Sequence, residues 1–214
     1  MIFEERRTVV GPGRLDDYIS VCHSDLWPSI RASGGKVICL LSGLIGDPQN
    51  ELVQITSWRS LYAWEKGQTA ARADLPGMYQ SEQVRLLRPI ASRPKSVIPE
   101  RDRRPYYGFR RFFIDPADMD EFVHCSEDGI WPRIESMGAS ILGLWTPTAA
   151  TSPMEIVLAT GYHSPSHWEQ TRYEGNRPLG VDRELWDKEN ALRRRRVELA
   201  HRSWVCLMRA HDLS

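Results

Sequence analysis

Alternating hydrophobic and polar residues predict four strands in each half of the chain. These stretches are rich in β-branched and aromatic residues and are bounded by turn-forming Gly, Pro, Asp and Asn, as is typical of strands. The predicted strands are residues 3–10, 36–45, 51–58 and 84–91 in the first half, and residues 107–114, 139–147, 154–162 and 203–210 in the second.

Two helices are predicted between the strands of each half. Apolar residues recur at helical spacing from Leu15 to Ile30 and again from Met119 to Ile134. Serines at 60 and 164 are typical N-caps for a second helix. Each half therefore has the order β-α-β-β-α-β, which is that of a ferredoxin-like unit.

A tandem duplication explains why the order appears twice. The pair Trp27-Pro28 recurs as Trp131-Pro132, at a spacing of 104 residues. At that same spacing 15 positions between residues 3 and 65 are identical without any gap, against about 4 expected by chance. Because proline lacks an amide donor and crowds the preceding turn, both prolines are expected to kink or restart their helices.

The predicted fold class is α+β, with two ferredoxin-like repeats forming an intrachain pseudo-dimeric α+β barrel. A four-stranded sheet with helices on one face leaves its other face open, and two repeats can bury these faces together. We expect a first repeat at 1–91, a Pro/Arg-rich linker at 92–105 and a second repeat at 106–214. The second repeat is longer and should contain an extra helix near 182–202, whose run Arg193–Arg196 has the pattern of a solvated helix face.

Composition is typical of a globular protein. Of 214 residues, 41% are hydrophobic, and 28 Lys and Arg balance 28 Asp and Glu. This balance argues against nucleic-acid binding, and the absence of a long apolar run argues against a membrane protein, so a cytoplasmic location is expected. The four scattered cysteines predict buried thiols, and a monomer or homodimer is feasible.

Two motifs resemble those of NIPSNAP-type domains. "MIFEERRTVVGPGRLDDY" resembles the opening strand, P-G turn and helix of that family, and "ITSWRSLYAWE" is similar to its later strand-to-helix segment. The resemblance implies membership of the dimeric α+β barrel superfamily, which includes cofactor-free oxygenases, isomerases, lyases and haem-binding enzymes. A histidine that the family often has on the third strand is replaced here by Thr56 and Thr160.

The arginine pair of each first strand is the first candidate for chemistry. Strand alternation points Arg6 and Arg7 to opposite faces, and likewise Arg110 and Arg111, so one of each pair must face inward. Such an arginine either binds an anionic oxygen of a substrate or forms an internal salt bridge, for example to Glu4.

Histidine and aromatic residues complete the candidate set. His23 precedes Trp27 by four residues and could act as general acid or base, whereas its counterpart in the second repeat is Glu127. His163, at the start of a helix, is a candidate donor or base. Flat, apolar ligands would be bound by four aromatic side chains, for which packing alone is the competing role. These are Trp27, Trp58, Trp145 and Tyr162.

The function expected from these residues is cofactor-independent acid/base chemistry of isomerase, lyase or oxygenase type on an apolar or aromatic metabolite. Arg6 or Arg7 would hold an anionic oxygen and His23 would move a proton. Neither a metal nor a cofactor is predicted, although haem is not excluded by the sequence. A second hypothesis is a non-catalytic small-molecule or haem-binding protein, and a third is an interaction or scaffold protein.

Overall fold

The computed structural model describes residues 1–71, 77–95, 98–149, 152–172 and 175–213. The chain forms two compact units, one of Met1–Arg88 with Met208–Ser214 and one of Pro89–Leu207. None of the described helices is long and apolar enough to cross a membrane.

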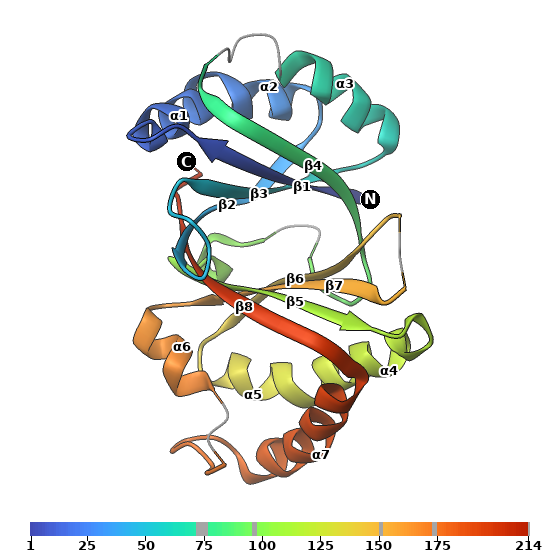
Figure 1. Ribbon diagram of the computed structural model, residues 1–214. Helices are drawn as coiled ribbons and strands as arrows, with labels where there is room; N and C mark the ends of the chain where they lie inside the picture. The colour runs from blue at the N-terminus through green and yellow to red at the C-terminus, as the bar shows by residue number, and fades with distance from the viewer. Residues whose placement is uncertain (72–76, 96–97, 150–151, 173–174, 214) are drawn as a thin grey trace. The chain divides into compact units, whose positions relative to one another are not determined.

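The first unit is a ferredoxin-like repeat. Its strands are ordered β4-β1-β3-β2 and all neighbours are antiparallel, with Arg6 opposite Gln54 on one side and Val84 on the other. The helices lie on one face of these strands (Figure 1). The elements are β1 (Ile2–Val10), α1 (Leu15–Val21), the π-helix η1 (Cys22–Leu26), α2 (Trp27–Ala32), β2 (Lys36–Ile45), β3 (Glu51–Trp58), α3 (Leu61–Ala71) and β4 (Tyr79–Pro89).

The second unit repeats this arrangement in the strand order β8-β5-β7-β6. Arg110 lies opposite Leu158, so the register of β5 on β7 is that of β1 on β3 and the spacing of 104 residues marks structurally equivalent positions. The predicted fold class of two ferredoxin-like repeats is confirmed. The elements are η2 (Glu100–Asp102), β5 (Tyr106–Ile114), η3 (Pro116–Asp118), α4 (Met119–His124), the π-helix η4 (Cys125–Ile130), α5 (Trp131–Ser136), β6 (Ser140–Pro147), β7 (Met154–Tyr162), α6 (Pro165–Thr171), α7 (Arg183–Leu199) and β8 (Ala200–Ala210).

Helix α7 lies in the longer segment of the second repeat, where the sequence predicts an added helix. It starts at an Asp182 cap, whose carboxylate accepts the amide N–H groups of Glu184 and Leu185. The helix ends at Leu199, and residues 200–202 belong to β8 rather than to the helix. The last residues of the chain pack in the first unit, where the amide of His211 donates to the Leu40 carbonyl at 2.9 Å.

A π-helical turn precedes each Trp-Pro pair. The helix is continuous through η1 and η4, and an α-helical segment restarts at Trp27 and at Trp131 with the proline in its first turn. A widened turn accommodates the proline ring and its missing amide donor, so the two restarts predicted from the sequence are seen as π-helices. Both tryptophans point into the core, with 1% and 3% of their surface exposed.

The Trp58 ring is enclosed by two glycines of the first unit. A Cβ atom added to Gly35 would lie 2.7 Å from the indole ring, and one added to Gly67 of α3 would lie 2.2 Å from it. The equivalent residues of the second unit are Ala139 and Thr171, beside the smaller Tyr162. The larger indole therefore requires glycine at both neighbouring positions.

Gly67→Ala tests this packing. In most helices the substitution stabilises by up to about 1 kcal/mol, but here we expect the free energy of unfolding to fall by about 1–3 kcal/mol because the added methyl overlaps Trp58. Urea denaturation measures the change. The double variant Gly67→Ala/Trp58→Tyr, which imitates the second unit, should recover much of the loss, and a stabilised single variant would contradict the packing described.

Candidate functional site

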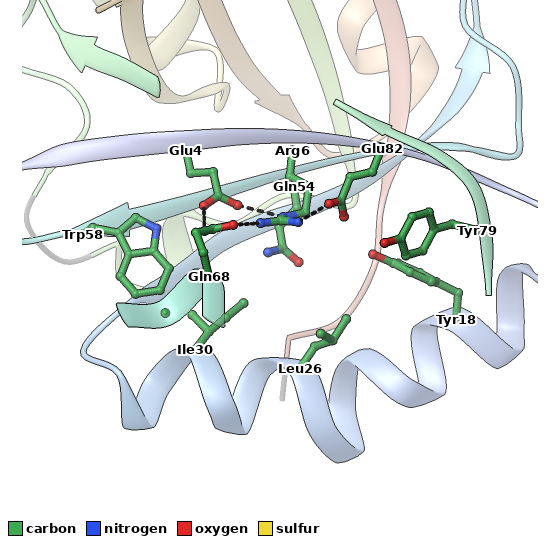
Figure 2. Close-up of a pocket in the computed structure, with 11 residues that line it drawn as sticks. Glu4, Arg6, Tyr18, Leu26, Ile30, Gln54, Trp58, Gln68, Tyr79 and Glu82 are labelled. Carbon is green, nitrogen blue, oxygen red and sulfur yellow. Dashed lines mark hydrogen bonds and ion pairs between the residues drawn. The ribbon is translucent and has the colours of Figure 1, made fainter. Parts of the chain in front are cut away.

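Each unit has a pocket between its sheet and its helices, and the pocket of the first unit is nearly filled. Its volume is about 20 Å³, enough for roughly one water molecule. The Trp58 ring occupies one end, and the centre is filled by polar side chains that bond to one another (Figure 2). The lining residues are Glu4, Arg6, Tyr18, Leu26, Ile30, Gln54, Trp58, Gly67, Gln68, Tyr79 and Glu82.

Arg6 is fully paired in this pocket. Its Nε lies 2.8 Å from Glu4 and its Nη1 lies 2.6 Å from Glu82, while Nη2 donates to Gln68 Oε1 at 2.6 Å. Burial alone would lower the pKa of Arg6, but the two carboxylates raise it above its usual value. Of the two roles considered for Arg6 from the sequence, the structure contains the internal salt bridge to Glu4.

Two indole donors beside the first pocket are also satisfied, whereas the buried Nε1 of Trp58, which lines the pocket, has no hydrogen-bond partner. Trp27 Nε1 donates to Gln54 Oε1 at 2.9 Å, and Trp64 Nε1 donates to Glu4 Oε2 at 2.6 Å. The first pocket therefore offers a ligand little space, and its arginine is matched by the surrounding carboxylates and amide.

The second unit has a larger cavity at the equivalent place, with a volume of about 230 Å³. Aromatic side chains from α5, β7 and α6 form part of its wall, and it contains five arginines but only one carboxylate. The aromatic residues are Trp131, Tyr162 and Trp168; the charged residues are Arg110, Arg133, Arg172, Arg193, Arg196 and Glu189.

The acceptors of the first pocket are missing from the second. The positions equivalent to Glu4, Gln54 and Gln68 hold Gly108, Leu158 and Arg172. Strand β8, which occupies the place of β4, contains no Asp or Glu. The donors, in contrast, are retained, since Arg110 replaces Arg6, and Trp131 and Trp168 replace Trp27 and Trp64.

Arg110 has no carboxylate partner among the described residues, and its guanidinium carbon lies 5.7 Å from the centre of the Phe112 ring. Burial lowers the pKa of Arg110, and the nearby Arg172 cation lowers it further, against an opposing influence of Tyr162. The pKa of Arg110 is thus shifted in the opposite direction to that of Arg6, because the second pocket has no carboxylate at the positions of Glu4 and Glu82.

Helix α7 adds a second partly buried cation to the cavity. Arg196 donates to Ser126 Oγ at 3.2 Å and lies over the Phe112 and Phe122 rings, while its Nε is sealed from solvent without a hydrogen-bond partner. Burial, followed by the Arg110 charge, lowers the pKa of Arg196 to about 9, so the group remains a cation at neutral pH. The one carboxylate of the cavity, Glu189, is ion-paired to Arg133.

Tyr162 is the buried hydroxyl of the cavity. Burial raises the pKa of Tyr162, and the Arg110 charge and contacts with Thr171 and Thr160 oppose that rise. The phenol is therefore neutral at pH 7 and can donate its proton to a negative oxygen beside it.

The remaining predicted site residues lie outside this cavity. Arg7 and Arg111 form ion pairs with the equivalent carboxylates Glu51 and Glu155. Trp145 is fully buried in β6. His163 is exposed, and its amide donates to Nδ1 of His167, whose Nε2 lies 2.9 Å from the Met137 carbonyl.

His23 and Trp27 pack together in the first unit, with ring centroids 4.4 Å apart. His23 does not line the pocket beside it, and the catalytic role predicted for it remains a prediction. The structure therefore brings together Arg110 and Tyr162 from the predicted set and adds Arg196, Trp131 and Trp168 to them.

The role of the arginine run in α7 was not predicted from the sequence. Residues 189, 193 and 196 share one helix face and line the cavity, whereas Arg194 and Arg195 are exposed. The signal was the helical spacing of four residues from Glu189 to Arg193 and of three from Arg193 to Arg196, which places these residues on one face and Arg194 and Arg195 on another.

Metal and haem binding depend on the donor groups that these residues offer. Within the part of the chain that the structure describes, no three His, Cys, Asp or Glu side chains form a group that could hold a metal ion. The cavity is lined by no His, Cys or Met, which are common axial ligands of haem, so its donors do not fit a haem held through such a ligand.

Comparisons with known proteins establish the fold. No family model and no curated protein matches the chain. A proposed monooxygenase from Lactobacillus acidophilus NCFM has a TM-score of 0.64 at 12% identity, covering 98% of this chain and 93% of that one. An anthrone oxidase-like protein has a TM-score of 0.55 at 13% identity, covering 99% and 91%.

Chlorite dismutase from Candidatus Nitrospira defluvii, solved with imidazole, has a TM-score of 0.54 at 10% identity and covers 99% of this chain and 92% of that one. These neighbours belong to the dimeric α+β barrel fold, which the chain shares over nearly its whole length.

Removing the equivalent arginines should have opposite effects on stability. Arg6→Met leaves Glu4 and Glu82 buried without a counterion, and we expect the free energy of unfolding to fall by about 3–5 kcal/mol. Arg110→Met removes a buried cation that has no carboxylate partner among the described residues, so the free energy should stay unchanged or rise by up to about 2 kcal/mol.

Urea denaturation followed by tryptophan fluorescence measures both variants. Arg194→Met, at an exposed position of α7, is the control for loss of one positive charge. Equal losses of stability in Arg6→Met and Arg110→Met would show that the two pockets are balanced in the same way.

Proposed function

We propose that the protein is a small-molecule enzyme whose active site is the cavity of the second unit, and that it acts on an aromatic or polyketide-like metabolite without an organic cofactor. The observation that carries this proposal is the difference between the equivalent pockets, because the first is nearly filled and its arginine is paired to carboxylates, while the second is open and aromatic-walled. Proteins of the same fold that are named as oxidases and monooxygenases support an enzymatic role.

The chemistry proposed is stabilisation of an enolate or phenolate. Two partly buried guanidinium groups, Arg110 and Arg196, would favour the ionised form of a substrate oxygen. Tyr162 would exchange the proton at that oxygen, since its phenol is neutral and buried among polar groups. The indole rings of Trp131 and Trp168 would bind the flat part of the substrate.

This assignment moves the proton-transfer role from the first unit to the second. The sequence predicts His23 as the acid or base, but in the structure this histidine lies beside Trp27 in the first unit and the cavity is lined by the second. The motif resemblance still supports a NIPSNAP-like relationship as part of the proposal.

Anthrone is a suitable first substrate, because it is flat, forms an enolate and is named for a protein of this fold. Its reaction with O₂ gives anthraquinone and water, with both oxygen atoms and all hydrogens accounted for. Oxygen uptake and anthraquinone absorbance would measure turnover by the purified protein without added cofactor.

Tyr162→Phe should lower turnover by about 10²–10⁴-fold while substrate still binds, because only the hydroxyl is removed. Tyr18→Phe is the control for loss of a buried phenol, since Tyr18 lines the first pocket and the second unit already has Phe122 at the position equivalent to Tyr18. Its turnover should be that of the unmodified protein.

His23→Ala separates the two assignments. Full activity in His23→Ala with loss in Tyr162→Phe supports the second-unit site, and the reverse result supports the histidine. Binding of anthrone and related enolisable aromatics without turnover would favour the second hypothesis, a non-catalytic small-molecule binder. A Soret band in the purified protein would instead indicate haem.

A further inference from the structure

We propose that the cavity of the second unit is a binding site for a carboxylate or a similar oxyanion on a small ring, held by Arg110 and Arg196 with Trp131 as an additional donor. The inference deepens the proposed function by stating that its ligand is an anion. It rests on that function only because it uses the same cavity.

Because the chain is duplicated, the first pocket shows how the charge of the equivalent arginine is balanced when carboxylates are present. In the first unit the equivalent arginine is bonded to Glu4, Glu82 and Gln68, so its positive charge and its donors are satisfied from within. In the second unit the positions of Glu4 and Gln68 hold Gly108 and Arg172. Since the arginine is retained while the acceptors are lost, the equivalent positions no longer supply the balancing negative charge, and an anionic ligand could supply it.

The indole donors show the same change. Trp27 donates to Gln54 at 2.9 Å, but the residue equivalent to Gln54 is Leu158, and the buried Nε1 of Trp131 has no hydrogen-bond partner. Trp131 and Leu158 both line the cavity, so the indole N–H that is bonded to an amide oxygen in the first unit belongs to a residue of the cavity wall in the second. An N–H group buried without an acceptor costs free energy that an acceptor on a ligand would recover.

The space left by the lost carboxylate is where the anion would sit. A Cβ atom on Gly108 would lie 3.3 Å from the Tyr162 ring and 3.8 Å from Trp168 Nε1, in ordinary or slightly tight contact. In the first unit this is the position from which Glu4 accepts from Arg6 and Trp64. A ligand carboxylate would therefore replace the Glu4 carboxylate among equivalent donors.

Helix α7 adds a charge that the first unit lacks. Arg196 reaches the cavity from this helix, with its Nε sealed and without a partner. Glu189, on the same helix, is paired to Arg133 and does not neutralise it by direct contact. Two cations of different origin thus converge on one cavity with no carboxylate bonded to either among the described residues.

Benzoate and benzamide provide the test, because they share ring and shape and differ in charge. Dissociation constants come from NMR titration of the ¹⁵N-labelled full chain, read at the indole N–H signals of Trp131 and Trp168. We expect benzoate to bind at least about tenfold more tightly than benzamide, as charge-assisted hydrogen bonds are stronger than neutral ones.

Three variants should remove the preference for benzoate. Arg110→Met and Arg196→Met each delete one cation, and Gly108→Glu restores the carboxylate of the first unit, which should compete with the ligand for Arg110. Arg194→Met, exposed on the same helix as Arg196, should keep the wild-type ratio. Circular dichroism confirms that each variant is folded.

The outcomes separate the inference from the function on which it rests. Equal binding of benzoate and benzamide, or a preference that survives in all three variants, overturns the anion site but leaves a small-molecule cavity. Failure of both compounds to bind overturns the cavity as well as the anion site. A benzoate preference that disappears in the three variants and persists in Arg194→Met establishes the proposal.

Discussion

A guanidinium placed between the sheet and the helices of a ferredoxin-like unit loses much of its hydration, and a group in the same space must balance its charge. The first unit meets this requirement with Glu4 and Glu82, one from the same strand as Arg6 and one from the neighbouring strand. Gln68 and Trp64 then donate to the Glu4 carboxylate and complete its hydrogen bonding. The space that remains in the pocket holds little more than a water molecule.

The two repeats divide stability and function between them. A paired arginine stabilises its unit and is of little use to a ligand, whereas a cation without a carboxylate partner costs stability and can bind. The second unit carries this cost at Arg110, and the insertion of α7 adds Arg196 and covers part of the cavity. Duplication allows this division, because one copy can keep the closed arrangement while the other departs from it.

Most of the fold could be predicted from the sequence. The spacing of 104 residues revealed both repeats, and alternation along the first strand correctly separated Arg6 from Arg7. The loss of acceptors is also visible when the two repeats are aligned, since Gly108 stands at the position of Glu4. It could not be interpreted without knowing that Glu4, Glu82 and Gln68 converge on Arg6, since Glu82 and Gln68 lie far from Arg6 along the chain.

The π-helices before Trp27 and Trp131 determine which side of the helix faces the sheet. Tyr18 and Trp27 are nine residues apart, as are Phe122 and Trp131. In an uninterrupted α-helix nine residues correspond to a rotation of about 180° beyond whole turns, which would place each pair on opposite sides. All four side chains are nevertheless buried. The widened turn absorbs one residue of helical phase, and by doing so it allows both ends of one helix to pack into the same hydrophobic core in each unit.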